Sequence, residues 1–443
     1  MPTTLTPAGV DASLLERLLE ARRRTDELFA IVNRESLYER PIPERHRIIF
    51  YIGHLEAFDW NLLSERGFGL QRFQPELDRL FAFGIDPVGG GLPDDQPSDW
   101  PSLEEVQSYA SRIRQILDYK IANAFEGSSN GEFPLPLLVN VAIEHRLMHA
   151  ETLAYMLHQL AFSHKINPGL RSNDQPNEPV VQQMIEIPAG AATLGLNRSD
   201  EAFGWDNEYE VCSVDVPSFA IDKFEVTNGQ YLDFLRAGGY ETRSFWSDDD
   251  WAWRSRNGIL NPVFWKRSDE KWLYRGMFED LLLPLNSPVY VSLAEARAYA
   301  VWAGKDLPTE AEWHRAAYAD HNGQERAYPS GDASPTEELG NFDFARWDPT
   351  PVNSFPAGES AFGVADMLGN GWEWTSTTFA PLPGFKAFPF YAGYSADFFD
   401  GKHFVIKGGS PRTAACMLRR SFRNWFQPHY QYVYAGFRCV QRG

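Results

Sequence analysis

Residues 134–161, PLPLLVNVAIEHRLMHAETLAYMLHQLA, form the most clearly patterned segment of this 443-residue chain. A proline at position 134 or 136 is suited to begin a helix, and nothing interrupts the segment before about Ala161. Apolar side chains recur at helical spacing: Val139, Ile143, Leu147, Ala150, Ala154, Leu157 and Ala161. The segment therefore predicts a long helix with this stripe in a core. Its predicted solvent side carries Glu144, Glu151, Tyr155 and His158.

Two histidines of this helix, His145 and His149, are four residues apart and lie about 40° apart on one face. That face also carries apolar residues, so we expect it to be buried as well. His54, in the apolar helical segment 45–63, is suited to supply a third nitrogen. Three neutral imidazoles suit Zn, Fe or Cu, and the spacing does not choose among them. The alternative is that these are ordinary hydrogen-bonded core histidines.

Three further helices are predicted before residue 165, at Leu14–Val32, from Pro43 to Leu62 or Leu63, and from Ser102 onward. The last has serine at the cap and glutamate three residues later, the capping-box pattern. With the helix at 134–161 they predict an up-and-down four-helix bundle over residues 1–165.

The composition changes after the bundle. Residues 166–183 are polar, contain several prolines and predict a linker. Residues 184–443 combine short strand-like runs with many glycines and prolines, and helical patterns only at Asn228–Arg236, Leu293–Trp302 and Thr309–Ala317. The sequence thus predicts an α+β protein of two domains, of which the second is rich in loops.

Charge and composition exclude several classes of protein. The formal net charge of −19 disfavours nucleic acid as a partner. No apolar run reaches the length of about 18 residues that a membrane helix needs, and the N-terminus lacks the apolar core of a secretory signal. The three cysteines form no closely spaced pair and predict no disulfide framework, so the cytoplasm is the expected compartment. The oligomeric state is not indicated.

A series of short motifs occurs in order through the second half. They are MIEIPAGAATLG (184–195), GWDNE (204–208), FEVTNGQYLDFL (224–235), LPTEAEWHRAA (307–317), GNGWEWT (369–375), KGGSPRTA (407–414), SFRNWFQPHY (421–430) and GFRC (436–439). The series resembles the formylglycine-generating enzymes, whose fold is a loop-rich variant of the C-type lectin fold. Thr413 and Leu418 stand where we align the two catalytic cysteines of those enzymes, so that activity is not expected here.

The combination of a histidine-bearing bundle with this second domain resembles the ergothioneine sulfoxide synthases and their relatives, the ovothiol sulfoxide synthases and selenoneine synthases. The resemblance covers nearly the whole chain. It implies a DinB-like bundle whose His54, His145 and His149 hold one non-haem Fe(II). It also implies an O2-dependent reaction that joins a sulfur or selenium donor to an imidazole carbon of a histidine derivative. Calcium in the C-terminal domain is left open.

The same resemblance implies which residues contact the substrates. The proton donor is expected to be Tyr391 or Tyr394, with Tyr391 preferred. Hercynine (trimethylhistidine) carries a quaternary ammonium, which aromatic faces bind. Trp425 and Tyr394 are therefore expected at the ammonium and Asn424 at the carboxylate.

Three positions depart from the enzymes that use γ-glutamylcysteine. Phe426 and Tyr430 replace an aspartate and an arginine, and Met148 stands where glutamine is frequent. An aromatic wall favours a selenosugar over a charged dipeptide, with cysteine as a close alternative; a cysteine carboxylate would then need a basic residue such as Arg72 or Arg79. Two other hypotheses are a lectin-like binding module without catalysis and a zinc-dependent DinB-type thiol transferase, although the latter would not need the second domain.

Overall fold

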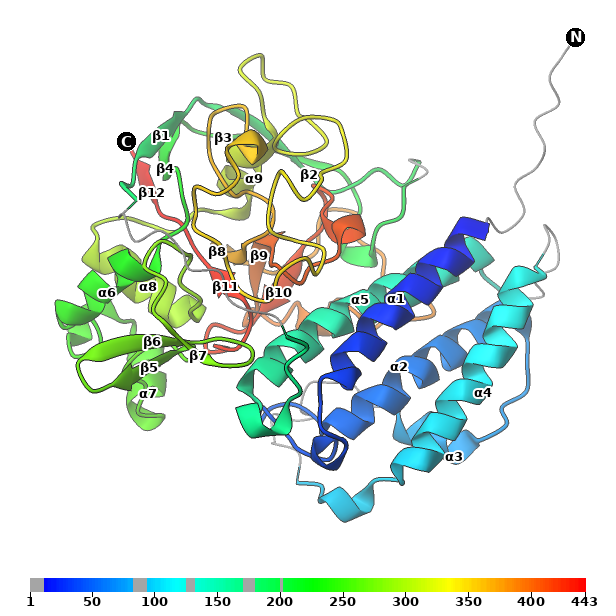
Figure 1. Cartoon of the computed structure of the whole chain (residues 1–443). Coiled ribbons are helices and arrows are strands. Elements are labelled where there is room, and N and C mark those ends of the chain that lie inside the picture. The colour runs from blue at the N-terminus through cyan, green and yellow to red at the C-terminus, as the bar shows by residue number, and fades with distance from the viewer. Residues whose placement is uncertain (1–11, 83–93, 125–131, 170–179, 200–201) are drawn as a thin grey trace, which may run out of the picture. The chain divides into compact units, whose positions relative to one another are not determined.

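The computed structural model describes residues 12–82, 94–124, 132–169, 180–199 and 202–443. The chain divides into two compact units, residues 1–170 and 171–443, and this boundary falls within the segment predicted as a linker. The first unit is helical and the second combines short strands with helices and long loops (Figure 1). The predicted α+β architecture of two domains is confirmed.

Four main helices build the first unit: α1 (Ala12–Ala30), α2 (Ile48–Leu62), α4 (Leu103–Ala122) and α5 (Leu135–Gln159). They run side by side in Figure 1, with α1 packed most extensively on α5 and α2 on α4. A π-helical turn at Leu63–Phe68 continues α2, and a short helix, α3 (Pro75–Leu80), follows it. These two elements were not predicted, because neither is long enough to show a helical period.

Local sequence signals explain where the helices begin. The Ser102 backbone N–H donates to the Glu105 carboxylate at 2.9 Å, and the Glu105 N–H donates to the Ser102 hydroxyl at 3.3 Å, as the capping box predicts. Helix α2 starts at Ile48 and not at Pro43, because the backbone is still extended at Arg47.

The solvent-facing side predicted for α5 is wrong. Its apolar stripe is buried from Val139 to Leu157, whereas Ala161 is exposed and lies beyond the helix end at Gln159. Glu144, Glu151, Tyr155 and His158 are buried too. Polarity alone misled the prediction here, because a buried polar side chain is tolerated when it has partners.

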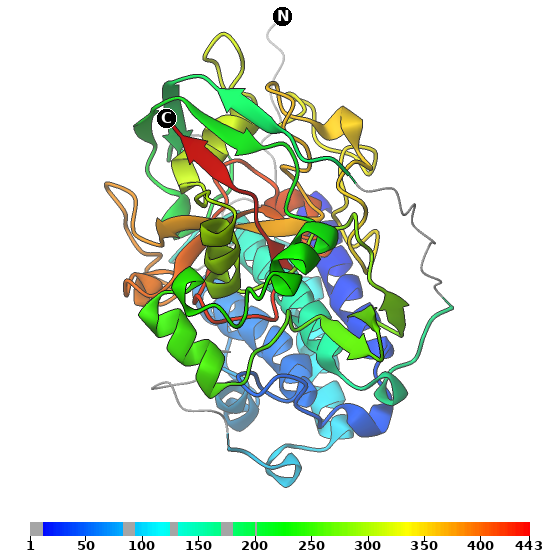
Figure 2. The ribbon, with the colours of Figure 1, turned by 90° about the vertical axis from the view of Figure 1, so that its left-hand side faces the viewer.

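The second unit contains twelve short strands among its described residues, in four separate sheets. One sheet has the order β10 (Asn424–Phe426), β9 (Phe404–Gly409), β8 (Gly371–Thr378), β11 (Ala435–Gly436). A second has the order β1 (Met184–Ile187), β4 (Phe219–Asp222), β12 (Val440–Arg442). The red C-terminal strand β12 lies beside green strand β4 in Figure 2. The remaining strands are β2 (Gly190–Leu194) with β3 (Cys212–Val216), and β5 (Trp265–Ser268), β6 (Lys271–Arg275) and β7 (Asp280–Leu282).

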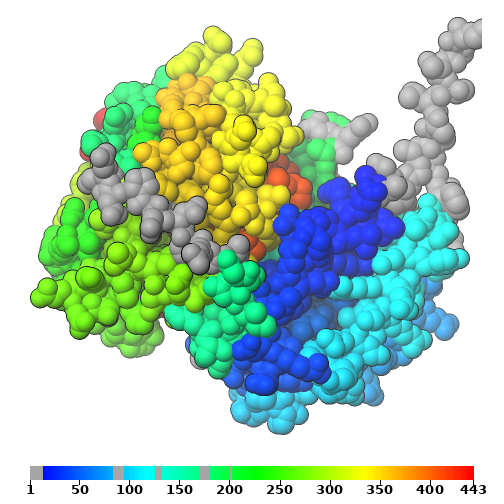
Figure 3. Space-filling model, viewed as in Figure 1, coloured from blue at the N-terminus to red at the C-terminus, as the bar shows by residue number. Residues whose placement is uncertain are grey.

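The helices of the second unit largely match the predictions. Helices α6 (Asn228–Arg236) and α8 (Leu293–Trp302) have the predicted bounds, and α9 (Glu310–Tyr318) follows the Thr309 cap. The prediction of only three helices is wrong, because α7 (Asp248–Arg256) also forms, with Ser247 as its cap and three aspartates in its first turn. Residues 322–362 are irregular as expected, and they appear in Figure 3 as a yellow area of the surface.

Buried apolar side chains form the core of the second unit, where Trp313 of α9 packs with Phe219 and Ile221 of β4 and with Val440 of β12. None of the helices described is both long and apolar enough to cross a membrane.

Candidate metal centre and aromatic site

Three imidazoles converge inside the helical unit. His54 lies on α2, and His145 and His149 lie one turn apart on α5. The Nε2 atom of His149 is 3.2 Å from Nε2 of His54 and 3.1 Å from Nε2 of His145. All three side chains are buried, and among the described residues they are the only group of three or more His, Cys, Asp or Glu residues with ligand atoms close enough for one metal ion.

The hydrogen bonding of His54 fixes which of its nitrogens is available. Its Nδ1–H donates to the backbone carbonyl of Phe81 at 2.7 Å, so Nε2 carries the lone pair that faces the other two rings. A metal-binding histidine usually donates its second ring nitrogen to a carbonyl or carboxylate in this way.

The separations between the nitrogens fit a shared metal ion. Metal–nitrogen bonds of about 2.1 Å place two ligand nitrogens about 3.0 Å apart at 90° and about 3.4 Å apart at the tetrahedral angle. The two separations in the structure, 3.1 and 3.2 Å, lie in this interval. Without a cation, lone pairs this close would repel one another unless protons were shared between them, so the three residues fit a metal.

Burial keeps the three rings neutral. It lowers the pKa of His54 to about 4, because the charged imidazolium would lose its hydration, and it lowers the pKa of His145 and His149 well below their usual range. The positive charge of Arg146 adds to the lowering at all three. Neutral imidazoles at physiological pH are the form that binds a metal.

Aromatic rings hold the ligands in place. Phe58 stacks on His145 with ring centroids 3.4 Å apart, and Phe50 stacks on His54 at 4.8 Å. Met148, the bundle residue predicted to contact substrate, lies on α5 between the two ligand histidines and is half-buried.

A second cluster, in the C-terminal unit, gathers aromatic residues predicted to contact substrate. Trp425 stacks on Phe379 at 4.1 Å and meets the edge of Tyr394 at 5.5 Å and 75°. The structure thus brings together the two side chains predicted to bind an ammonium. Asn424, beside them on β10, accepts a hydrogen bond from the Trp425 backbone N–H at 2.8 Å through Oδ1.

Both candidate proton donors lie on one loop, residues 388–395. The ring centroids of Tyr391 and Tyr394 are 5.5 Å apart, and Tyr394 stacks on Trp205 at 4.0 Å. The loop is bonded at both ends to Asp206, which accepts from the Ser395 hydroxyl at 2.6 Å and from the Phe388 N–H at 3.3 Å. Tyr394 is buried, whereas Tyr391 is half-buried.

The segment that leads into Asn424 is held by two buried carboxylates. Glu208 accepts from Arg419 Nε at 2.8 Å and from the Ser421 hydroxyl at 2.7 Å. Glu310 accepts two hydrogen bonds from Arg423, at 2.8 and 3.0 Å. These charge-assisted bonds fix the backbone immediately before β10.

Comparison with known proteins finds a family model that matches the second unit and relatives that match nearly the whole chain. Residues 171–443 match the sulfatase-modifying factor enzyme 1-like domain. The whole chain is 39% identical to the hercynine oxygenase of Mycolicibacterium thermoresistibile, over 97% of this chain and 94% of that protein. It is 32% identical to the hercynine oxygenase of Mycolicibacterium smegmatis, over 97% of this chain and 98% of the relative. The chain belongs to the hercynine oxygenase family.

A more distant relative of this hercynine oxygenase family member is named for ergothioneine biosynthesis. Ergothioneine biosynthesis protein 1 of Neurospora crassa is 29% identical over 92% of this chain, and this chain spans 55% of that longer protein.

The remaining predicted site residues of this family member form a separate aromatic pair. Phe426 and Tyr430 stack with centroids 5.2 Å apart and an angle of 9° between the rings, and Tyr432 meets the edge of Tyr430 at 5.6 Å. All three are half-buried. Tyr434, the fourth aromatic residue of the wall predicted from the sequence, is instead buried in the core against Phe264 and Tyr290. The role of the other three in binding a donor stays a prediction.

The supporting role of the GWDNE motif was not predicted from the sequence. Trp205 and Asp206 position the tyrosine loop, while Glu208 positions the chain before Asn424. The two acidic residues beside Trp205 in this motif were the available signal, but their partners lie about 200 residues away in sequence. For calcium, the described residues of this unit offer no cluster of three acidic ligands, and that expectation stays a prediction.

Proposed function

We propose that this hercynine oxygenase family member is an Fe(II)- and O2-dependent synthase that joins a sulfur or selenium donor to imidazole C2 of hercynine. The observation that carries the proposal is the convergence of three neutral Nε2 atoms from His54, His145 and His149. The names of the full-length relatives support the substrate and the ergothioneine-type product.

For a thiol donor the reaction balances as a four-electron reduction of O2. The thiol and C2 each lose a hydrogen, a C–S bond forms, one oxygen atom ends in the sulfoxide and the other leaves as water. Iron bound by three imidazoles supplies the redox chemistry and retains open positions for small ligands.

The side chains of the C-terminal unit are assigned to binding and proton transfer. Trp425 and Tyr394 present aromatic faces to the trimethylammonium, and Asn424 binds the carboxylate. The Tyr391 hydroxyl donates the proton, since this ring is the more accessible of the two on the loop. These roles come from the family resemblance together with the geometry inside this unit.

Two donors compete within this proposal. The stacked rings of Phe426 and Tyr430 favour the flat face of a sugar, which supports a selenosugar. The relatives named for ergothioneine biosynthesis favour a thiol. Arg72, one candidate for gripping the carboxylate of a cysteine donor, is already paired with Glu65.

The test is a reaction of the anaerobically iron-loaded protein with hercynine, O2 and each donor in turn, followed by mass spectrometry. We expect a product with a new bond at C2 for at least one of selenosugar, thiosugar, cysteine and γ-glutamylcysteine. The dipeptide should be the poorest, because each missing charged contact costs about 1.5–3 kcal/mol of binding. No product with any donor would contradict the synthase proposal, and tight hercynine binding without iron would favour a binding module.

A further inference from the structure

Arg146 lies between the two helices that carry the histidines and is fully buried. It follows His145 directly on α5. Its Nη1 donates to Glu56 at 3.0 Å, and its Nη2 donates to Asp59 at 2.7 Å and to the Leu55 carbonyl at 3.0 Å. All three acceptors lie on α2, within five residues of His54. The guanidinium therefore joins α2 to α5 beside the imidazoles.

Glu56 is the residue at which this pairing branches. Besides Arg146, its carboxylate accepts from Nε and Nη2 of Arg114 on α4, at 2.9 and 2.7 Å. Arg114 in turn donates to Asp26 on α1 at 2.8 and 2.7 Å. One set of ion pairs therefore runs from α1 through α4 and α2 to α5.

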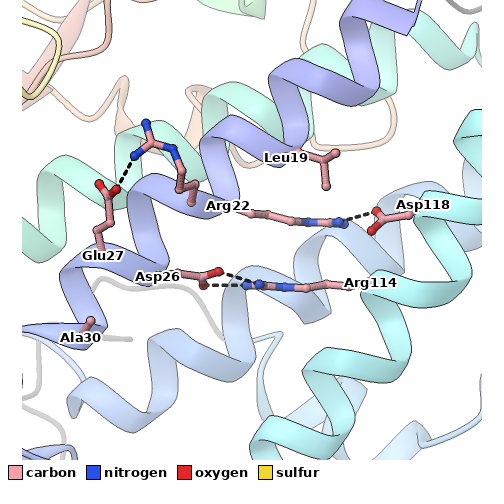
Figure 4. Close-up of a pocket in the computed structure, with 8 residues that line it drawn as sticks. Leu19, Arg22, Asp26, Glu27, Ala30, Arg114 and Asp118 are labelled. Carbon is pink, nitrogen blue, oxygen red and sulfur yellow. Dashed lines mark hydrogen bonds and ion pairs between the residues drawn. The ribbon is translucent and has the colours of Figure 1, made fainter.

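The outer end of this set opens to solvent. Asp26 and Arg114 line a pocket of about 450 Å³, together with the paired Arg22 and Asp118 (Figure 4). Asp26 and Arg114 are 47% and 30% exposed, so water screens their charges, whereas Glu56 and Arg146 are each about 1% exposed. Arg22 belongs to the buried part, since it is 2% exposed and lies 4.0 Å from Glu56 and 3.8 Å from Asp59. The charges that matter to the histidines are therefore the inner ones.

A buried guanidinium has the same sign of charge as the metal ion. An unbalanced positive charge in a medium of low dielectric opposes the binding of a divalent cation to neutral imidazoles. Arg146 is fully buried, follows His145 directly on α5 and bonds to α2 within five residues of His54, so a carboxylate beside it must offset its charge. Glu56 and Asp59 both make this contact, and Glu56 is the one that also binds Arg114.

We propose that Glu56 is a positioning residue of the metal centre, which offsets the charge of Arg146 and so allows the three imidazoles to bind a divalent metal tightly. The inference rests on the proposed metal site and adds to it a residue outside the ligand set. Glu56 is expected to affect the affinity for the metal, and this affinity is measurable without turnover.

The test uses the full-length protein and Co²⁺ as the probe, titrated anaerobically against a chelator of known affinity. Glu56→Gln keeps the shape of the side chain and removes its charge, and it should raise the Co²⁺ dissociation constant about 10-fold or more. The matched control is Asp26→Asn, which removes a partner of Arg114 at the solvent end and should leave the constant within twofold.

A double variant separates charge from packing. Glu56→Gln with Arg146→Gln removes both charges and should recover at least threefold of the affinity lost in Glu56→Gln alone. Affinity unchanged in Glu56→Gln, or a double variant as weak as the single one, would overturn the inference. If Glu56→Gln does not fold, Asp59→Asn removes the other carboxylate beside Arg146 and should weaken Co²⁺ binding in the same direction; unchanged binding there would overturn it.

The two proposals fail differently in this titration. A wild-type protein that binds no Co²⁺ would remove both the metal site and the role of Glu56. Tight binding that does not depend on Glu56 would remove only the latter.

Discussion

His54 donates its Nδ1 hydrogen to the carbonyl of Phe81, and this one bond determines which nitrogen faces His145 and His149. In the same way, a few contacts decide the orientation of Tyr394 and Trp425, which meet edge to face. At this scale, single side chains carry the proposed chemistry, so single substitutions test it.

Tyr391 and Tyr394 are distinguished by removing one hydroxyl at a time. Tyr391→Phe should lower the rate of product formation roughly 100-fold while iron content and the KM for hercynine stay within twofold, because only the proton donor is lost. Tyr394→Phe should have a much smaller effect on the rate, since that ring is buried against Trp205. Steady-state kinetics with iron analysis measures this, and the reverse order would assign the role to Tyr394.

Trp425 should account for a preference for hercynine over histidine. A trimethylammonium loses less hydration than an ammonium when it meets an aromatic face, so we expect hercynine to bind better by about 1–2 kcal/mol. Trp425→Leu should reduce that preference to a few tenths of a kcal/mol, whereas Phe362→Leu, elsewhere in the unit, should not. Calorimetry measures both, and equal affinities in the wild type would contradict the ammonium site.

At the scale of elements, the two candidate tyrosines lie on a loop, and Asn424 and Trp425 lie on a strand of only three residues. Loop 388–395 is held by Asp206, and the chain before β10 (Asn424–Phe426) is held by Glu208 and Glu310. Such loops depend on specific side-chain bonds because they lack a backbone ladder.

Asp206→Asn tests the anchoring of the tyrosine loop. The amide cannot accept at both of its terminal atoms, so one of the bonds to Ser395 or Phe388 is lost, at a cost of about 1–3 kcal/mol. Hydrogen exchange should become faster across residues 388–395. The exposed Asp215→Asn on β3 is the control, and exchange as slow as in the wild type would show that Asp206 does not hold the loop.

At the scale of the whole molecule, residues far apart in sequence meet through buried ion pairs. Glu373 of GNGWEWT binds Arg438 of GFRC at 2.5 and 2.7 Å, and this pair ties β8 to the chain that leads into β12. Two further buried acids, Glu225 and Asp366, lie near Arg438, so the C-terminal unit carries a pH-dependent contribution to its stability.

Asp366 should make this unit less stable as the pH rises. Burial raises its pKa to about 7, although the charge of Arg438 and a bond from Asn370 oppose the shift. The unfolded chain loses this proton near pH 4 and the folded chain keeps it until about pH 7. Stability therefore falls between pH 4 and 7 and levels off above.

The comparison with Asp366→Asn measures that contribution. The asparagine variant cannot ionise, so its free energy of unfolding relative to the wild type should rise by about 3 kcal/mol between pH 5 and 8. Urea unfolding followed by tryptophan fluorescence is the measurement, with the exposed Asp249→Asn as control. A difference that does not vary with pH would show that Asp366 ionises normally in the folded protein.

The sequence predicted what depends on local pattern and missed what depends on distant partners. Spacing alone placed His145 and His149 on one face, and the cap at Ser102 located the start of α4. By contrast, nothing local to Glu144 or His158 indicated burial, and nothing in GWDNE indicated contact with Ser395 or Arg419. The ion pairs of Glu56 were missed for the same reason, since its partners come from α4 and α5.

The central claim is that the three imidazoles bind one iron ion, and X-ray absorption at the iron edge of the anaerobically Fe(II)-loaded full-length protein tests it most directly. We expect three imidazole nitrogens at about 2.1 Å, with the outer-shell scattering that histidine rings produce. A spectrum fitted by oxygen ligands alone, without imidazole scattering, would contradict it.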